Sequence, residues 1–301
     1  MKILIFLIAL IPFALFSQQN ADTTYHPEIK YPAYASGTGP VVCIDEGHYN
    51  FHTMNGRYKP FAMLLERDGY NVKAFPGTFR ASELEQCNIL VIANALSDRA
   101  EDYTIPDPSA FTGAEIETLK KWVTDGGSLF LIADHMPMAD ASKDLAAAFG
   151  FEFTNGFVFD TLSRGIAFFN LDNKTLTDCI ITKGRDTTEN VHEVVTFTGQ
   201  AFTIPGDATS ILTFSDAFVN FLPDTAWVFD ETTKKIDAGG WSQGAFMKYG
   251  KGKIAVFGEA AMFTAQVAGP EPRKAGMNSE YATENYQFLL NIIHWLDGKL
   301  E

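Results

Sequence analysis

The sequence has little cysteine. Its 301 residues contain three, Cys43, Cys87 and Cys179, and this odd, widely spaced set does not form a disulfide framework. Cys43 lies in the apolar run Pro40–Ile44, which is typical of an inert buried thiol. We therefore expect a hydrophobic core, without help from disulfide bonds, to hold the fold together.

Positive charge is also scarce. Lysine and arginine total 23 against 37 aspartates and glutamates, which gives a formal net charge of −14, and no run of basic residues occurs. Because nucleic-acid phosphates are bound by clustered lysines and arginines, this balance argues against a nucleic-acid partner. Hydrophobic residues make up 46% of the chain, which is a globular composition.

A long apolar run occurs at the N-terminus and is not repeated later. Lys2 precedes the run Ile3–Phe16, which is too short to span a bilayer comfortably but fits a secretory signal. We expect residues 1–17 to be a signal peptide and the mature protein to be secreted or periplasmic. An uncleaved membrane anchor is the alternative. No membrane contact is expected after cleavage.

Strand and helix patterns alternate from residue 40 onwards. Short, continuous apolar runs predict buried strands at 41–44, 72–75, 89–93 and 128–133. Helical spacing predicts helices at 57–67, 139–149 and 283–296, and a Thr112–Glu115 capping box opens another that ends at Gly126. This alternation predicts an α/β fold in which helices cover both faces of a mostly parallel sheet.

Two regions differ from this pattern. Residues 18–39 predict an extended lead-in to a single domain over 40–301. Within that domain, about 151–240 predicts a β-rich antiparallel insertion with strand-like runs at 194–198, 211–214 and 226–229. After it, Gly250-Lys251-Gly252 joins two apolar runs and predicts a hairpin.

Polar residues follow the predicted parallel strands, where open α/β sheets bind their ligands. The first strand precedes Asp45 to His52, the third precedes Asn94, the fourth precedes Asp134, and the late strand 253–258 precedes Glu259. The candidate catalytic residues are Asp134, His135, Asp45 and His48. The candidate ligand-binding residues are Glu46, His52, Arg57, Asn94 and Glu259, of which Arg57 would clamp an anionic group.

Two chemistries are open for these residues. His48 and His52 are spaced i, i+4 and could hold a divalent metal with Asp45 or Asp134, so that a bound water is activated. Without a metal, a carboxylate could orient His48 or His135 as a general base. The structural alternative is that both aspartates cap helices and the histidines make ordinary hydrogen bonds.

The segment Gly240-Trp241-Ser242-Gln243-Gly244 matches the nucleophile-elbow pattern. An elbow needs a strand before the serine and a helix after it, whereas here a glycine pair precedes and a strand–turn–strand pattern follows. The later histidine, His294, belongs to the apolar stripe of the last helix. We therefore interpret Ser242 as part of a β-hairpin.

Four segments, 44–52, 122–135, 196–200 and 256–266, resemble an uncharacterised family of the class I glutamine amidotransferase-like superfamily. Similar domains occur in exported proteins of polysaccharide-degrading bacteria, sometimes joined to unsaturated rhamnogalacturonyl hydrolases. The resemblance covers nearly all of the mature chain and implies a flavodoxin-like three-layer sandwich. Amidotransferases place a nucleophilic cysteine on the turn after a central strand. The turn that looks equivalent, 133–137, carries Asp134 and His135 instead.

The resemblance and the strand-end residues together lead to a functional expectation. It is an exported, hydrolase-like protein that acts on a polar, carbohydrate-derived small substrate and does not hydrolyse glutamine by a thiolate. A divalent metal is an open alternative, and no other cofactor is expected. The rival expectation is a non-catalytic carbohydrate-binding domain or an envelope interaction domain with a degenerate amidotransferase-like fold.

Overall fold

The computed structural model describes residues 19–100, 103–161, 165–269 and 273–301. The expected signal peptide, residues 1–17, lies outside the described residues. The described chain opens with β1 (Gln19–Ala21), which pairs with β16 (Ala265–Ala268), and β17 (Arg273–Gly276) completes this small antiparallel sheet. From residue 22 to residue 40 the chain forms turns and irregular structure.

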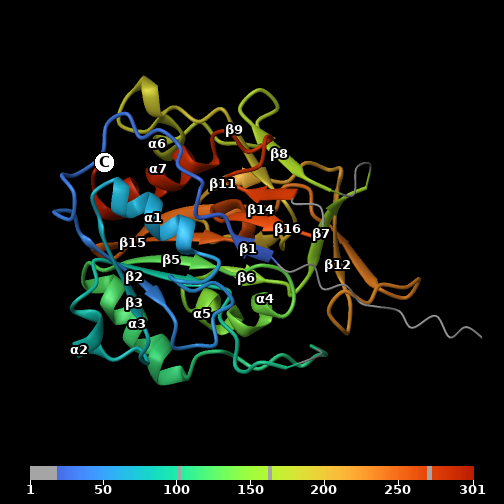
Figure 1. Ribbon diagram of the computed structural model, residues 1–301. Coiled ribbons are helices and arrows are strands. Elements are labelled where there is room, and N and C mark those ends of the chain that lie inside the picture. The colour runs from blue at the N-terminus through green and yellow to red at the C-terminus, as the bar shows by residue number, and fades with distance from the viewer. Residues whose placement is uncertain (1–18, 101–102, 162–164, 270–272) are drawn as a thin grey trace, which may run out of the picture.

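Nine strands of the described chain form the central sheet (Figure 1). Its parallel half has the order β3-β2-β4-β5-β15, with β2 (Val41–Asp45), β3 (Asn71–Phe75), β4 (Ile89–Ala93), β5 (Ser128–Ile132) and β15 (Gly252–Phe257). The antiparallel half consists of β6 (Glu152–Phe153), β10 (Phe202–Thr203), β11 (Thr209–Thr213) and β14 (Ser242–Tyr249). The expectation of a mostly parallel sheet therefore holds only between β3 and β15.

Helices cover both faces of this sheet, as the alternating pattern predicts (Figure 1). On one face, α1 (Lys59–Arg67) and α7 (Asn285–Asp297) pack in one core with Phe130 of β5. On the other face, α3 (Gly113–Asp125) packs with Leu131 of the same strand. Successive side chains of a strand point to opposite faces, so a strand buried on both sides must be apolar throughout.

The boundaries of the predicted helices agree with the structure to within two residues, except that one predicted helix is divided. The predicted capping box opens α3: Thr112 Oγ1 accepts a hydrogen bond from the Glu115 N–H, and Glu115 Oε2 accepts one from the Thr112 N–H. The helix predicted at 139–149 is divided into α4 (Met138–Ala141) and α5 (Lys143–Ala148), because the ψ of 0° at Ser142 departs from helical geometry. No helix in the described ranges is long and apolar enough to cross a membrane.

Residues 151–240 contain mainly short antiparallel strands. Besides those in the central sheet, β7 (Phe157–Asp160), β12 (Phe218–Leu222) and β13 (Lys234–Asp237) form one sheet, and β8 (Ala167–Asn170) pairs with β9 (Glu193–Thr196). Two short helices also lie in the chain, α2 (Ala81–Leu84) before β4 and α6 (Ile180–Lys183) after β8. The strand predicted at 226–229 is wrong. These residues form a turn, because the φ of 67° at Trp227 is incompatible with extended chain.

Cys43 and Cys87 form a disulfide, which corrects the expectation of an inert thiol and of a fold without disulfide bonds. Their Cα atoms lie 5.7 Å apart although 44 residues separate them in the sequence. The cause is tertiary: β2 pairs directly with β4, and Cys87 lies just before β4 begins. Cysteine spacing alone gives no sign of this parallel pairing.

Candidate functional site

The sheet order brings the predicted strand-end residues to one edge. Strands β2, β4, β5 and β15 are neighbours and parallel, so their carboxyl ends lie side by side. The polar residues there separate into two clusters with the same residue types. The first cluster is Asp45, His48 and Glu115. The second cluster is Asp134, His135 and Glu259.

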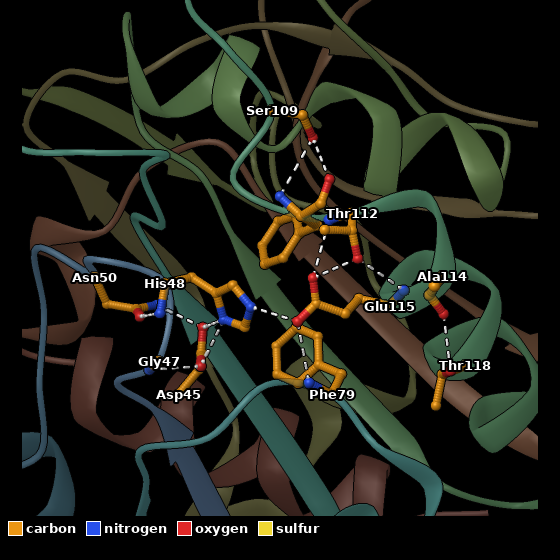
Figure 2. A network of polar contacts seen from close by, with 11 residues as sticks. Asp45, Gly47, His48, Asn50, Phe79, Ser109, Thr112, Ala114, Glu115 and Thr118 are labelled. Atoms are coloured by element: carbon orange, nitrogen blue, oxygen red, sulfur yellow. Dashed lines mark hydrogen bonds and ion pairs between the residues drawn. The ribbon is translucent and has the colours of Figure 1, made fainter.

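In the first cluster, His48 lies between two carboxylates (Figure 2). Its Nδ1 is 3.0 Å from both carboxylate oxygens of Asp45, and its Nε2 is 3.1 Å from Glu115 Oε1. The rings of Phe79 and Phe111 flank the imidazole at centroid distances of 4.4 and 4.9 Å. All three polar side chains are buried, so this cluster ties the β2 loop to the start of α3.

The pKa shifts of the first cluster favour its charged form. Burial alone would lower the pKa of His48, but hydrogen bonds and negative charge from Asp45 and Glu115 outweigh it and raise that pKa. Burial alone would raise the pKa of Glu115, but hydrogen bonds from Thr112, His48 and the Phe79 N–H lower it to about 2. Because both imidazole nitrogens are already bonded, His48 has no free lone pair for a metal or a substrate proton.

His52 does not complete a metal site with this pair. Its ring is buried and stacked on Tyr58, with centroids 4.7 Å apart. Burial and the positive charges of Arg57 and Arg99 lower the pKa of His52 to about 3. Across the described ranges, no three His, Cys, Asp or Glu residues are grouped so that they could hold a metal ion.

Two other predicted ligand residues lie beside the first cluster. Glu46 Oε1 accepts a hydrogen bond of 2.8 Å from the Met54 N–H, which closes the loop that carries His52. The Arg57 guanidinium lies over the Phe51 ring at 4.0 Å, and Arg99, which the sequence analysis did not single out, lies over the same ring at 5.3 Å. Positive charge is therefore concentrated at this loop.

In the second cluster, His135 keeps one nitrogen available. Nδ1 lies 2.7 Å from the Met136 carbonyl oxygen, which can only accept, so Nδ1 carries the proton. Nε2 lies 3.7 Å from Asp134 Oδ1 and has no hydrogen-bond partner among the residues that the structure describes. The ring stacks on Phe157 at 4.3 Å and meets Trp227 nearly at right angles at 4.7 Å. Nε2 can therefore take up a proton, and Asp134 would stabilise the resulting cation.

Backbone and side-chain hydrogen bonds fix the orientation of Asp134. Its Oδ1 accepts from the His135 N–H at 2.8 Å, and its Oδ2 accepts from the Ala260 N–H at 3.3 Å. Asn94 Oδ1, at the end of β4, accepts from the Asp134 N–H at 2.9 Å. Asn94, predicted to bind ligand, thus positions the turn that carries Asp134.

Glu259 forms a buried acidic pair with Asp134. Its exposed fraction is 1%, and its two oxygens accept hydrogen bonds from the Ala261 and Met262 N–H groups at 2.9 and 2.7 Å. Burial and the negative charge of Asp134 nevertheless raise the pKa of Glu259 well above its ordinary value. Glu259 is therefore held in surroundings that disfavour its ionised form.

Glu115, Tyr58 and Trp227 also belong to the site, although their sequence patterns do not indicate it. Glu115 appeared only as a capping residue, yet its Oε1 binds His48. Tyr58 stacks on His52 and donates a 3.3 Å hydrogen bond to the carbonyl of Ala260, the residue whose N–H donates to Asp134. Trp227 lies in the segment 226–229, for which the sequence predicts a strand. Glu115 lies in a capping box and Trp227 in an apolar run, and neither local pattern indicates a contact with a distant histidine.

The elbow motif takes no part in either cluster. Ser242 begins β14, the first strand of the hairpin with β15, and its Oγ donates to Ser210 Oγ at 2.7 Å. His294 is fully buried, with Nε2 2.6 Å from Asp68 Oδ2. The interpretation of Ser242 as part of a β-hairpin is confirmed.

Comparisons with known proteins identify solved structures of similar fold but no sequence family that includes this chain. No protein-family model and no curated protein sequence matches the chain. The solved structure of the mmIFT52 N-terminal domain matches with a TM-score of 0.61 and 16% identity, over 85% of this chain and 97% of that one. Cytoplasmic protein STM3548 from Salmonella typhimurium matches with a TM-score of 0.51 and 14% identity, over 85% and 98%. A ThuA-like protein from Bacteroides uniformis matches with a TM-score of 0.48 and 11% identity, over 92% and 96%.

Proposed function

We propose that the chain is an exported hydrolase that acts on a polar, carbohydrate-derived small molecule at the second cluster. One observation carries this proposal: His135 Nε2 has no hydrogen-bond partner in the described chain, while Asp134 lies 3.7 Å away. A proton acceptor backed by a carboxylate at the carboxyl edge of a parallel sheet is suited to general base catalysis.

In the proposed reaction, His135 Nε2 accepts a proton from water as the water oxygen bonds to the substrate. The same nitrogen returns that proton to the leaving group when the scissile bond breaks. Asp134 stabilises the intermediate imidazolium. Glu259 is too buried to touch substrate, and we assign it a positioning role, because Asp134 is bonded to the backbone of the residue that follows it.

We also propose that the chain is exported and belongs to the flavodoxin-like, amidotransferase-like group that its sequence resembles. A parallel half-sheet between two helical layers supports the fold, and the Cys43–Cys87 disulfide supports an oxidising compartment. The remaining thiol, Cys179, lies at the start of α6 and away from the 133–137 turn in sequence. This arrangement supports a chemistry other than thiolate attack on glutamine.

A specific observation favours the alternative, a non-catalytic carbohydrate-binding or envelope interaction domain. Phe157 and Trp227 cover much of the His135 ring, and the exposed fraction of the His135 side chain is 15%. Backbone amides already bind both Asp134 and Glu259. A site built in this way could hold a ligand without turning it over.

The two candidates are separated by His135→Gln and Asp134→Asn, assayed on nitrophenyl glycosides and acetylated sugars. General base catalysis contributes about 100-fold or more, so we expect turnover to fall by at least that factor while the melting temperature stays near that of the wild type. Ser242→Ala is the matched control and keeps its turnover. A wild-type protein that binds sugars but hydrolyses none of these substrates would contradict the hydrolase and favour the binding domain.

A further inference from the structure

An aromatic surface adjoins the second cluster. Its members are the side chains of Phe157, Phe159, Phe221, Trp227 and Phe229, here called the aromatic shelf, whose rings contact one another at centroid distances of 4.6 to 6.4 Å. Phe157 is buried, whereas Trp227 is 57% exposed and Phe229 is 38% exposed. Exposed rings of this size on one surface mark an interaction site.

Trp227 has an unfavourable backbone conformation. Its φ is 67°, a left-handed value that a bulky side chain rarely adopts. The turn is held against residues 103–105: the Ala226 N–H donates to the Tyr103 carbonyl at 2.8 Å, and the Ile105 N–H donates to the Asp224 carbonyl at 3.0 Å. Such strain persists where the surrounding structure enforces it, and it is concentrated at functional sites.

Packing alone does not explain this conformation. A tryptophan that served only the core would gain stability by burial, yet more than half of Trp227 faces solvent. Its nearest ring contacts are with His135 of the second cluster, at a centroid distance of 4.7 Å, and with Phe157 of the shelf, at 4.6 Å. The strained turn therefore presents an open ring beside the His135 imidazole, whose Nε2 has no hydrogen-bond partner in the described chain.

We propose that Trp227 is the stacking platform for the sugar ring of the ligand and holds that ring beside His135. A pyranose has one face of C–H groups and a rim of hydroxyls, and the C–H face complements the negative face of an indole. The identity of the reacting group rests on the proposed function, whereas the platform serves the hydrolase and the binding domain equally.

The surroundings of the shelf favour a sugar over an apolar partner. Two cavities, of about 610 and 170 Å³, are lined in part by residues of the segment 222–234, and the smaller one is lined by Thr225 and Val228, which lie close to Trp227 in the sequence. Their lining includes Asp140, Asn155, Asp224, Asp230 and Lys234. These side chains can exchange hydrogen bonds with hydroxyls, whereas an apolar partner would remove their charged groups from water at a cost.

The test is binding of the full mature chain to an array of mono- and oligosaccharides, followed by calorimetric titration with the sugar that binds best. We expect Trp227→Ala to raise the Kd about tenfold, because one aromatic contact of this kind is lost. Trp227→Phe, which keeps a stacking face, should recover most of the affinity. Tyr281→Ala, which removes another half-exposed ring outside the shelf, should leave the Kd unchanged.

Two results would overturn the platform: a wild-type chain that binds no sugar on the array, or a Trp227→Ala variant that binds as tightly as the wild type. Loss of a dimer in Trp227→Ala on gel filtration would also overturn it and would assign the shelf to a second copy of the chain. The Asp134→Asn variant separates the platform from the proposed hydrolase, because the variant should lose turnover and keep sugar binding. Sugar binding that is kept without turnover in the wild type removes the hydrolase and leaves the platform standing.

Discussion

The two clusters contain the same chemical groups at the same edge of the sheet, yet their histidines differ. Both nitrogens of His48 are bonded to carboxylates and its side chain is 5% exposed. His135 uses one nitrogen on a carbonyl, keeps the other free, and is 15% exposed. Residue type and position at a strand end therefore do not decide the role. The number of hydrogen bonds already made within the protein does.

The carboxyl groups show the same contrast. Hydrogen bonds lower the pKa of Glu115 to about 2, so its negative charge stabilises the folded state. Burial and the charge of Asp134 raise the pKa of Glu259, so its ionisation is disfavoured there. In the first cluster a histidine lies between the two carboxylates, whereas Asp134 and Glu259 form an acidic pair that is bonded to backbone N–H groups, and such pairs are more typical of functional sites.

The largest expected effect is a difference in the free energy of unfolding between variants of the two cluster histidines. His48→Ala leaves two buried carboxylates without their cation and should lower the free energy of unfolding by about 4 kcal/mol. His135→Ala removes a ring that is 15% exposed and makes one hydrogen bond, and because it leaves no buried ion pair broken it should cost only about 1 kcal/mol. Urea denaturation followed by circular dichroism measures both. Equal losses would show that the two histidines have the same structural role.

A somewhat smaller effect is expected from the disulfide, which joins the first-cluster strand β2 to the segment before β4. Replacing Cys43 and Cys87 together by alanine should lower the free energy of unfolding by about 3 kcal/mol, because the unfolded chain loses a cross-link over 44 residues. Cys179→Ala is the control for removing a thiol alone. If sugar affinity also fell in the double variant, the disulfide would support the second cluster as well as the first.

The sequence predicted the individual strands and helices of the fold better than it predicted which strands pair. Continuous apolar runs identified β2, β4 and β5, and the Thr112–Glu115 box identified the start of α3, because these signals are local. The mixed sheet and the disulfide depend on which strands become neighbours, and no local pattern records that. The turn at Trp227 was missed for a different reason: an apolar run has the same composition whether it is extended or bent.

The candidate site was predicted in its residue types but not in its organisation. The strand-end rule named Asp134, His135 and Glu259, and it equally named Asp45 and His48. What separates them is the second carboxylate on His48, which comes from Glu115 at a distance of 67 residues along the chain. Hydrogen-bond saturation is a tertiary property, so the sequence could not rank one cluster above the other.

The two clusters should also differ in the pH dependence of their stability, with opposite sign. The pKa of Glu115 is about 2 when folded and has a reference value of 4.5, so its contribution to stability is complete above pH 4.5 and is lost as the pH falls towards 2. The pKa of Glu259 is raised, so its contribution is complete below its reference value of 4.5 and is lost as the pH rises through the folded pKa.

Glu115→Gln and Glu259→Gln test this dependence in urea denaturation at several pH values, with Glu117→Gln on the exposed side of α3 as the control. The deficit of Glu115→Gln relative to the wild type should be largest above pH 4.5 and shrink towards pH 2, because the glutamine cannot ionise. Any gain from Glu259→Gln should grow as the pH rises. Parallel stability profiles for the two variants would mean that the fold favours the ionised form of Glu259 as it favours that of Glu115. The electrostatic contrast between the two clusters would then be wrong.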